Sequence, residues 1–150
     1  MSAENLFLFF NNGILLAWLL LVFAPGWPST QRIVHSFAIP LVIAVAYLFA
    51  VASGSGESEE GASFFSLPGV MLFFANPWSA LAGWLHYLVF DLFVGAWEVR
   101  DSRRRGIPHL WVVPCLFFTL MLGPIGLGLY AALRRLKGGG LSLEEGEHLA

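Results

Sequence analysis

Apolar residues fill four long stretches of this chain, and most of the charged residues lie between or beyond them. Asp, Glu, Lys and Arg are absent from residues 5–31, 33–56, 61–90 and 106–133. A helix needs roughly 20 apolar residues to cross the hydrocarbon core of a bilayer. The pattern therefore predicts an all-α, four-transmembrane-helix bundle, with spans at about residues 6–24, 33–52, 78–97 and 107–133.

The remaining segments are shorter or more polar. Residues 64–75 are apolar but too short to cross, so we expect a short interfacial or re-entrant helix before the third span. Residues 53–63 are rich in Gly, Ser and Glu, which is typical of a flexible polar loop. Residues 1–136 are expected to form a single membrane domain, with a kink at Pro40, and residues 137–150 a disordered tail.

Composition favours an integral membrane protein. The chain is 57% hydrophobic and 12% charged, against about 25% charged residues in soluble domains. No basic, aromatic-bearing soluble module is present, so nucleic acid is not expected as a partner. The single cysteine, Cys115, excludes an intrachain disulfide. The N-terminus carries Glu4 instead of a basic segment, so we expect the first apolar run to be retained rather than cleaved as a signal peptide.

Four spans would place both termini on one face and the connections after spans one and three on the other. Five basic residues fall in those connections and three lie on the terminal face. The first group comprises Arg32, Arg100, Arg103, Arg104 and Arg105, and the second Arg134, Arg135 and Lys137. The positive-inside rule then favours cytoplasmic connections after spans one and three, in what we expect to be a bacterial inner membrane.

Asp91 is an ionisable residue inside the predicted third span. A carboxylate in the bilayer interior costs at least about 2.5–3.5 kcal/mol. On a helix, Trp84, Tyr87, Gly95 and Glu98 share its face, so this stripe is expected to face the interior of the bundle. Two interpretations stay open: Asp91 is an acid or base, with Tyr87 as donor and Trp84 as aromatic wall, or it is a structural hydrogen-bond or ion-pair partner.

Two further residues of this span have similar alternatives. Glu98 is either a second catalytic carboxyl group or a solvated or Arg-paired residue at the end of the helix. His86 is rotated by about 140° from Asp91 on an ideal helix. It is therefore either catalytic or packed against a different neighbour.

His35 and His109 begin the second and fourth spans, at the face where the third span ends. They could converge with Glu98 and Asp101 as metal ligands. The chain has only four histidines and no His-x-x-His or Glu-x-x-His pair. We therefore expect no metal and no other cofactor.

The basic residues after the third span predict contacts with charged groups, and the glycines of the fourth span predict close helix packing. Arg103, Arg104 and Arg105 suit lipid phosphate groups, or they set orientation and pair locally with carboxylates. Because glycine lets helix backbones approach closely, Gly123, Gly126 and Gly128 are predicted at a helix–helix contact.

Four consecutive motifs carry a family resemblance. They are Ala-Gly-Trp-Leu-His-Tyr-Leu-Val-Phe-Asp-Leu-Phe-Val-Gly (82–95), Trp-Glu-Val-Arg-Asp-Ser-Arg-Arg-Arg-Gly-Ile-Pro-His (97–109), Pro-Cys-Leu (114–116) and Thr-Leu-Met-Leu-Gly-Pro-Ile-Gly-Leu (119–127). In this order they resemble the neoxanthin-synthase-like family, named after the fourth abscisic-acid-deficient plant locus. The resemblance covers residues 66–134 by motif and the first two spans by hydropathy.

This resemblance implies a carotenoid-related membrane protein. Plant members convert violaxanthin to neoxanthin in plastid membranes. We expect no transit peptide, because the chain resembles the short prokaryotic members, whose substrate need not be violaxanthin. The implied ligand is a carotenoid or other isoprenoid lipid, beside membrane lipids, and association into a homo-oligomer is left open.

The implied reaction needs one proton delivered to an epoxide oxygen and one removed from the polyene, without a redox cofactor. The candidate catalytic residues are Asp91, His86 and Glu98. The candidate substrate-binding residues are Trp84, Tyr87, Trp97 and His109. The alternative is a non-enzymatic membrane protein that binds pigment or lipid. A small transporter would need oligomerisation.

Overall fold

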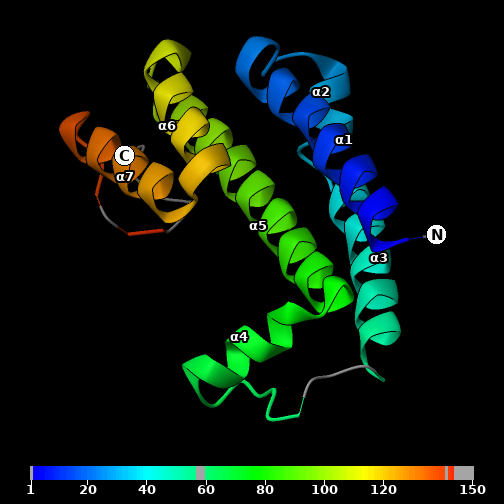
Figure 1. Cartoon of the computed structure of the whole chain (residues 1–150). Coiled ribbons are helices and arrows are strands. Elements are labelled where there is room, and N and C mark those ends of the chain that lie inside the picture. Colours follow the sequence, from blue (N-terminus) through cyan, green and yellow to red (C-terminus); the bar gives the residue numbers. More distant parts are fainter. Residues whose placement is uncertain (1, 57–59, 141, 144–150) are drawn as a thin grey trace.

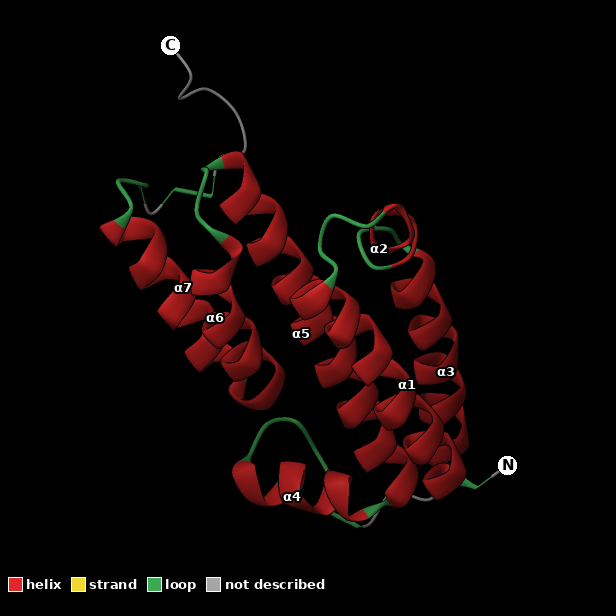
Figure 2. Ribbon diagram, turned by 90° about the horizontal axis from the view of Figure 1, so that it is seen from above, coloured by secondary structure: helices red, strands yellow, loops and turns green. Residues whose placement is uncertain are grey.

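The computed structural model describes residues 2–56, 60–140 and 142–143, and within them the chain forms seven helices and no strand (Figures 1 and 2). In chain order these are α1 (Ala3–Phe23), α2 (Pro28–Ile33), α3 (Ala38–Gly54), α4 (Leu67–Ala75), α5 (Pro77–Arg104), α6 (His109–Leu122) and α7 (Pro124–Leu136). The all-α prediction is confirmed. Part of the expected polar loop (57–59) and most of the expected disordered tail (141 and 144–150) lie outside the described residues.

The 28-residue helix α5 is the axis of the molecule. In both views α1 and α3 lie on one flank of α5 and the α6–α7 pair lies on the other (Figures 1 and 2). The helix begins sharply because the Asn76 side chain accepts hydrogen bonds from the backbone N–H groups of Trp78 and Ser79, at 2.8 and 3.2 Å. Pro77 occupies its first position, where no N–H is needed. Positive φ at Gly106 (64°) turns the chain away soon after the helix ends.

Three contacts place the C-terminal part of α1, the α2 segment and the C-terminal part of α5 at one end of the molecule. His109, at the start of α6, contacts the backbone oxygen of Val22. Arg103 donates to the backbone oxygen of Pro25, and Arg100 contacts His35. At the other end, the last turn of α3 lies against the first turn of α5, and α4 packs across that region (Figure 1).

The segment predicted as a fourth span, 107–133, is not one helix in the structure. It is divided at Gly123, which has φ 38° and ψ −90°, and Pro124 opens the next helix. The two helices α6 and α7 fold against each other as a hairpin (Figure 2). Positive φ suits glycine, and Pro124 lacks the N–H that a continuous helix would use. The absence of charge misled the sequence-based prediction, because the hairpin is as apolar as a span.

This hairpin changes the expected path of the chain. Its turn lies beside Asp91, near the middle of α5, while Tyr130 returns to Asp101 near the end of α5. The expected arrangement with both termini on one face is therefore not confirmed. The N-terminal end of α1 lies on the side of α4, and α7 ends at the opposite end of the molecule (Figure 1).

The basic residues consequently gather at one end instead of dividing five to three between two faces. All eight Lys and Arg residues of the chain belong to α2, to the last part of α5 with Arg105, or to the end of α7 with Lys137. The contacts above bring these three segments together.

The remaining predicted elements differ less from the structure. The short apolar segment at 64–75 forms the separate helix α4, as expected. Pro40 lies in the first turn of α3 and does not kink it. By length and composition, α1 and α5 are the two described helices that could cross a membrane, whereas α3 and α6 are apolar but shorter. Four full spans are thus not confirmed.

The hairpin depends on close packing at Gly126. A Cβ atom added there would collide with the backbone and side chain of Thr119 on α6. The packing prediction is confirmed for Gly126 and for Gly123, which lies against Asp91. It is wrong for Gly128, which is exposed and has open space around it.

We expect Gly126→Ala to lower the free energy of unfolding by at least about 1–3 kcal/mol, because α7 must move away from α6. Thermal unfolding in detergent measures this. Gly128→Ala is the matched control and should leave stability unchanged or raise it by up to about 1 kcal/mol, since alanine favours helix. Equal stability of the two variants would contradict the close crossing.

Candidate functional site

Within the polar stripe of α5, Tyr87, Asp91 and Glu98 lie against the α6–α7 hairpin, and Trp84 lies against α1. The Tyr87 hydroxyl donates a 2.8 Å hydrogen bond to the backbone oxygen of Leu120. A Cβ atom added to Gly95 would lie 2.6 Å from the Trp18 ring and 3.4 Å from Leu116. Close packing therefore requires glycine at that position.

Asp91 lies at the centre of this stripe, half-buried beside the hairpin turn. Its two carboxylate oxygens lie 2.9 and 3.3 Å from the position that a Cβ atom of Gly123 would take. The Tyr87 side chain, one turn earlier, interacts with this carboxyl group. Oδ2 is buried and has no hydrogen-bond partner among the described residues. Asp91 is thus a half-buried carboxyl group with one buried oxygen that has no hydrogen-bond partner among the described residues.

Trp84, the residue predicted to form an aromatic wall, packs against Tyr87 and against α1. Trp84 lies with its ring centroid 5.2 Å from that of Tyr87 and 5.6 Å from that of Phe7. Its indole N–H donates to Oδ1 of Asn11 on α1, at 3.1 Å. Trp84 is 38% exposed, so part of its surface stays available to a ligand.

Glu98 is fully buried, so the interpretation of a solvated or Arg-paired residue at a helix end is wrong. Its Oε1 accepts a 2.9 Å hydrogen bond from the Thr119 hydroxyl of α6. Its Oε2 has no hydrogen-bond partner among the described residues. Glu98 therefore connects α5 to the hairpin.

Three of the histidines lie in separate places. His86 is exposed and stacks on Phe90 at 4.5 Å between centroids, with Tyr47 of α3 at 6.4 Å. It belongs to the α3 side of α5, away from the polar stripe. His109 donates through Nε2 to the backbone oxygen of Val22, at 2.9 Å, and so ties α6 to α1.

His35 lies between α2 and α3 and accepts at Nδ1 from the Arg100 guanidinium, at 3.1 Å. Burial, together with the positive charges of Arg100 and Arg103, lowers the pKa of His35 to about 4. The imidazole is therefore neutral at pH 7, as an acceptor must be. Within the described part of the chain, no three His, Cys, Asp or Glu side chains gather to hold a metal ion.

A buried charge cluster near the end of α5 was not predicted. Asp101 accepts a 2.7 Å hydrogen bond from the Tyr130 hydroxyl, and the single N–H of Arg105 Nε is shared between its two carboxylate oxygens, each at 3.0 Å. Nε of Arg134 lies 3.3 Å from the same carboxylate, and Arg104 lies at 3.8 Å. The side chains of Asp101 and Arg134 are 4% and 3% exposed. This cluster fastens the end of α7 to α5.

Trp97, a candidate for substrate binding, belongs to this cluster. Its ring packs edge-on against Tyr130 at 5.4 Å, and the Arg134 guanidinium lies over it at 6.0 Å. Of the three candidate headgroup residues, Arg103 and Arg104 are exposed, and Arg105 is half-buried on Asp101. Arg104 and Arg105 thus pair locally with a carboxylate, Asp101, as in the alternative interpretation.

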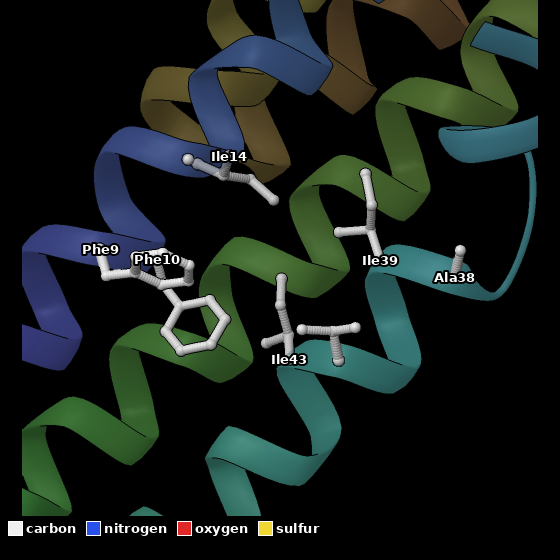
Figure 3. Close-up of a pocket in the computed structure, with 8 residues that line it drawn as sticks. Phe9, Phe10, Ile14, Ala38, Ile39 and Ile43 are labelled. Carbon is white, nitrogen blue, oxygen red and sulfur yellow. The ribbon is translucent and has the colours of Figure 1, made fainter. Parts of the chain in front are cut away.

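An open apolar groove of about 260 Å³ lies between α1 and α3, separate from the polar stripe (Figure 3). Its lining consists of Phe9, Phe10, Gly13, Ile14, Ala38, Ile39, Val42 and Ile43. No stripe residue contributes to it.

All the elements of the described residues are helices, and two of them, α1 and α5, are long and apolar enough to cross a membrane. The family model for "ABA DEFICIENT 4-like" proteins matches residues 5–130, and the chain belongs to this family. The family inferred from the motifs is thereby confirmed, and it relates the chain loosely to carotenoid and neoxanthin biosynthesis. Searches of curated proteins and of solved structures give no match.

The charge cluster yields a stability prediction. Arg134→Met should lower the free energy of unfolding by about 3–5 kcal/mol, because Asp101 loses a buried partner. Arg135→Met is the matched control, since Arg135 is exposed on the same helix, and it should change stability by less than about 0.5 kcal/mol. Chemical denaturation in mild detergent measures both. If the Arg134→Met variant were as stable as the Arg135→Met variant, the cluster would not be what holds α7 against α5.

Proposed function

We propose that this protein is an integral membrane isomerase of a carotenoid or related isoprenoid, acting by acid–base chemistry at Asp91. Family membership supports the substrate class. The observation that carries the reaction type is the half-buried Asp91 carboxyl group, with Oδ2 unpartnered, between the Tyr87 side chain and the hairpin turn.

The proposed membrane placement has α1, α3 and α5 crossing the bilayer and α6–α7 entering from the basic end and returning to it. At 1.5 Å per residue, α3 is about 25 Å long, which suits a crossing in a thin or locally thinned bilayer. The basic end faces the cytoplasm, in accordance with the positive-inside rule. Large apolar side chains that would face lipid support this placement, among them Leu16, Leu41, Val45, Leu48 and Phe90.

One carboxyl group can complete the proposed reaction. Asp91, in its protonated form, donates to the epoxide oxygen as the adjacent C–O bond breaks. The other oxygen of the resulting carboxylate then removes a proton from the neighbouring polyene carbon, and the electron pair of that C–H bond forms the new double bond. The products are an allenic alcohol and the original protonated carboxyl group, so no electrons enter or leave. When a positioned side chain delivers one proton and removes another, the reaction proceeds by general acid–base catalysis.

The other stripe residues have positioning roles in this proposal. Trp84 presents its exposed ring to the polyene, and Tyr87 orients the Asp91 carboxyl group. Glu98 lies seven residues further on, about 10 Å along the helix axis. That distance is too large for Glu98 and Asp91 to contact the same reacting atoms, so Glu98 holds the hairpin through Thr119.

The α1–α3 groove favours a second candidate function. A groove lined by apolar residues can hold part of a pigment or lipid without chemistry. In that case the protein binds a carotenoid and returns it unchanged.

We expect Asp91→Asn to reduce turnover of an epoxy-carotenoid by about 10²-fold or more while the protein stays folded. Purified protein is incubated with the epoxide, and chromatography detects the allenic product. Glu98→Gln and His86→Gln serve as controls and should keep most of the activity. Loss of turnover in Glu98→Gln alone would transfer the acid–base role to Glu98.

The same experiment separates the two candidate functions. Wild-type protein that retains the epoxide and releases it unchanged would contradict catalysis and support the binding function. Substitutions in the groove, such as Ile39→Ala, would then weaken pigment retention, whereas Asp91→Asn would not.

A further inference from the structure

Asn12 is an exposed polar residue in the middle of α1. It lies one position before Gly13, the midpoint of Ala3–Phe23. The preceding residue, Asn11, accepts a hydrogen bond from Trp84 within the chain. The Asn12 side chain makes no hydrogen bond to any described residue. Of these two adjacent amides, Asn11 therefore has a hydrogen-bond partner within the chain, and Asn12 is exposed without one among the described residues.

This inference depends on the membrane placement proposed above. At the centre of a spanning helix, Asn12 would lie in the hydrocarbon core, where lipid tails offer no hydrogen bond. Polar side chains at such positions bond across to neighbouring helices. A lipid tail over this face would leave both the amide N–H groups and the carbonyl oxygen unsatisfied.

The residues around Asn12 form a helix-pairing pattern. Asn5, Leu8, Asn12, Leu15 and Leu19 are all exposed, and their spacing is three, four, three and four residues. We call these five residues the α1 outer face. Such spacing is the heptad pattern of two helices packed at a shallow angle. Of the two asparagines on this face, Asn5 lies in the first turn of α1 and Asn12 at the centre, and an asparagine in the core of such a pair selects register and the number of helices.

We propose that the α1 outer face binds the same face of a second copy of this chain, with the two Asn12 amides hydrogen-bonded to each other. Copies inserted in the same orientation hold Asn12 at the same depth. A two-fold axis along the membrane normal brings the two amides together. An amide is self-complementary, because its N–H groups donate and its carbonyl oxygen accepts. No ion or other ligand is needed at this interface.

Disulfide cross-linking in native membranes tests the interface. In a Cys115→Ala background, Leu15→Cys places a thiol on the α1 outer face, and Val45→Cys places one near the middle of α3 on a different exposed surface. Oxidation should give a dimer with Leu15→Cys and little or none with Val45→Cys at matched expression. Equal cross-linking of the two, or none with Leu15→Cys, would overturn the proposal.

The role of the amide is tested by Asn12→Leu, which keeps the helix apolar. Energy transfer between labelled copies in liposomes of defined lipid should show a dissociation constant raised by about 3- to 20-fold, the range expected for one interhelical hydrogen bond in a membrane. An unchanged dissociation constant would overturn the Asn12 pairing.

Extraction with alkaline carbonate separates this inference from the membrane placement on which it rests. Protein that is released by carbonate is not embedded, and both the placement and the pairing are then overturned. Protein that stays in the membrane yet fails to cross-link through Leu15→Cys overturns the pairing alone, and catalysis at Asp91 is unaffected.

Discussion

The structure depends on covering the carboxyl-bearing face of α5. Asp91, Glu98 and Asp101 project from one long helix whose neighbours are otherwise apolar. An uncovered carboxylate in a hydrocarbon environment costs at least about 2.5–3.5 kcal/mol. The α6–α7 hairpin lies over all three residues, with its turn at Asp91, Thr119 at Glu98, and Tyr130 with Arg134 at Asp101.

The three carboxyl groups differ in the number of hydrogen-bond and ion-pair partners around them. Asp101 receives a hydroxyl and several guanidinium groups, which is the environment of a structural anion. Glu98 receives one hydroxyl and is fully enclosed. Asp91 meets the turn itself, where Gly123 contributes no side chain, and keeps an unpartnered oxygen. Glu98 also has an unpartnered oxygen, Oε2, but Glu98 is fully buried whereas Asp91 is only half-buried, and this difference in burial is the reason for assigning the chemistry to Asp91.

Much of this arrangement could be predicted from the sequence. Helical periodicity places Tyr87, Asp91 and Glu98 on the face that meets the hairpin, and a helix alone determines that relation. The motifs from Ala82 to Leu127 identified the family. The hairpin could not be predicted from hydropathy, because an apolar re-entrant pair and an apolar span contain the same residues. The Gly123–Pro124 pair was the available signal, and it was interpreted as packing instead of a turn.

The buried cluster around Asp101 was missed for a related reason. Arg134 lies 33 positions from Asp101 and follows an apolar run, so a single continuous span would place it at the opposite face. Only the reversal of the chain at Gly123 brings Arg134 and Tyr130 back to the end of α5. The same error in the path of the chain therefore also misplaced the end of α7 and divided the basic residues between two ends of the molecule.

The central claim is that α6–α7 enters the membrane and returns to the same side. Single cysteines at Pro108, Ile125 and Lys137, in a Cys115→Ala background, can be labelled with a membrane-impermeant maleimide in vesicles of defined orientation. The account predicts labelling of Pro108→Cys and Lys137→Cys from the cytoplasmic side only, and no labelling of Ile125→Cys from either side. Labelling of Pro108→Cys and Lys137→Cys from opposite sides would contradict it.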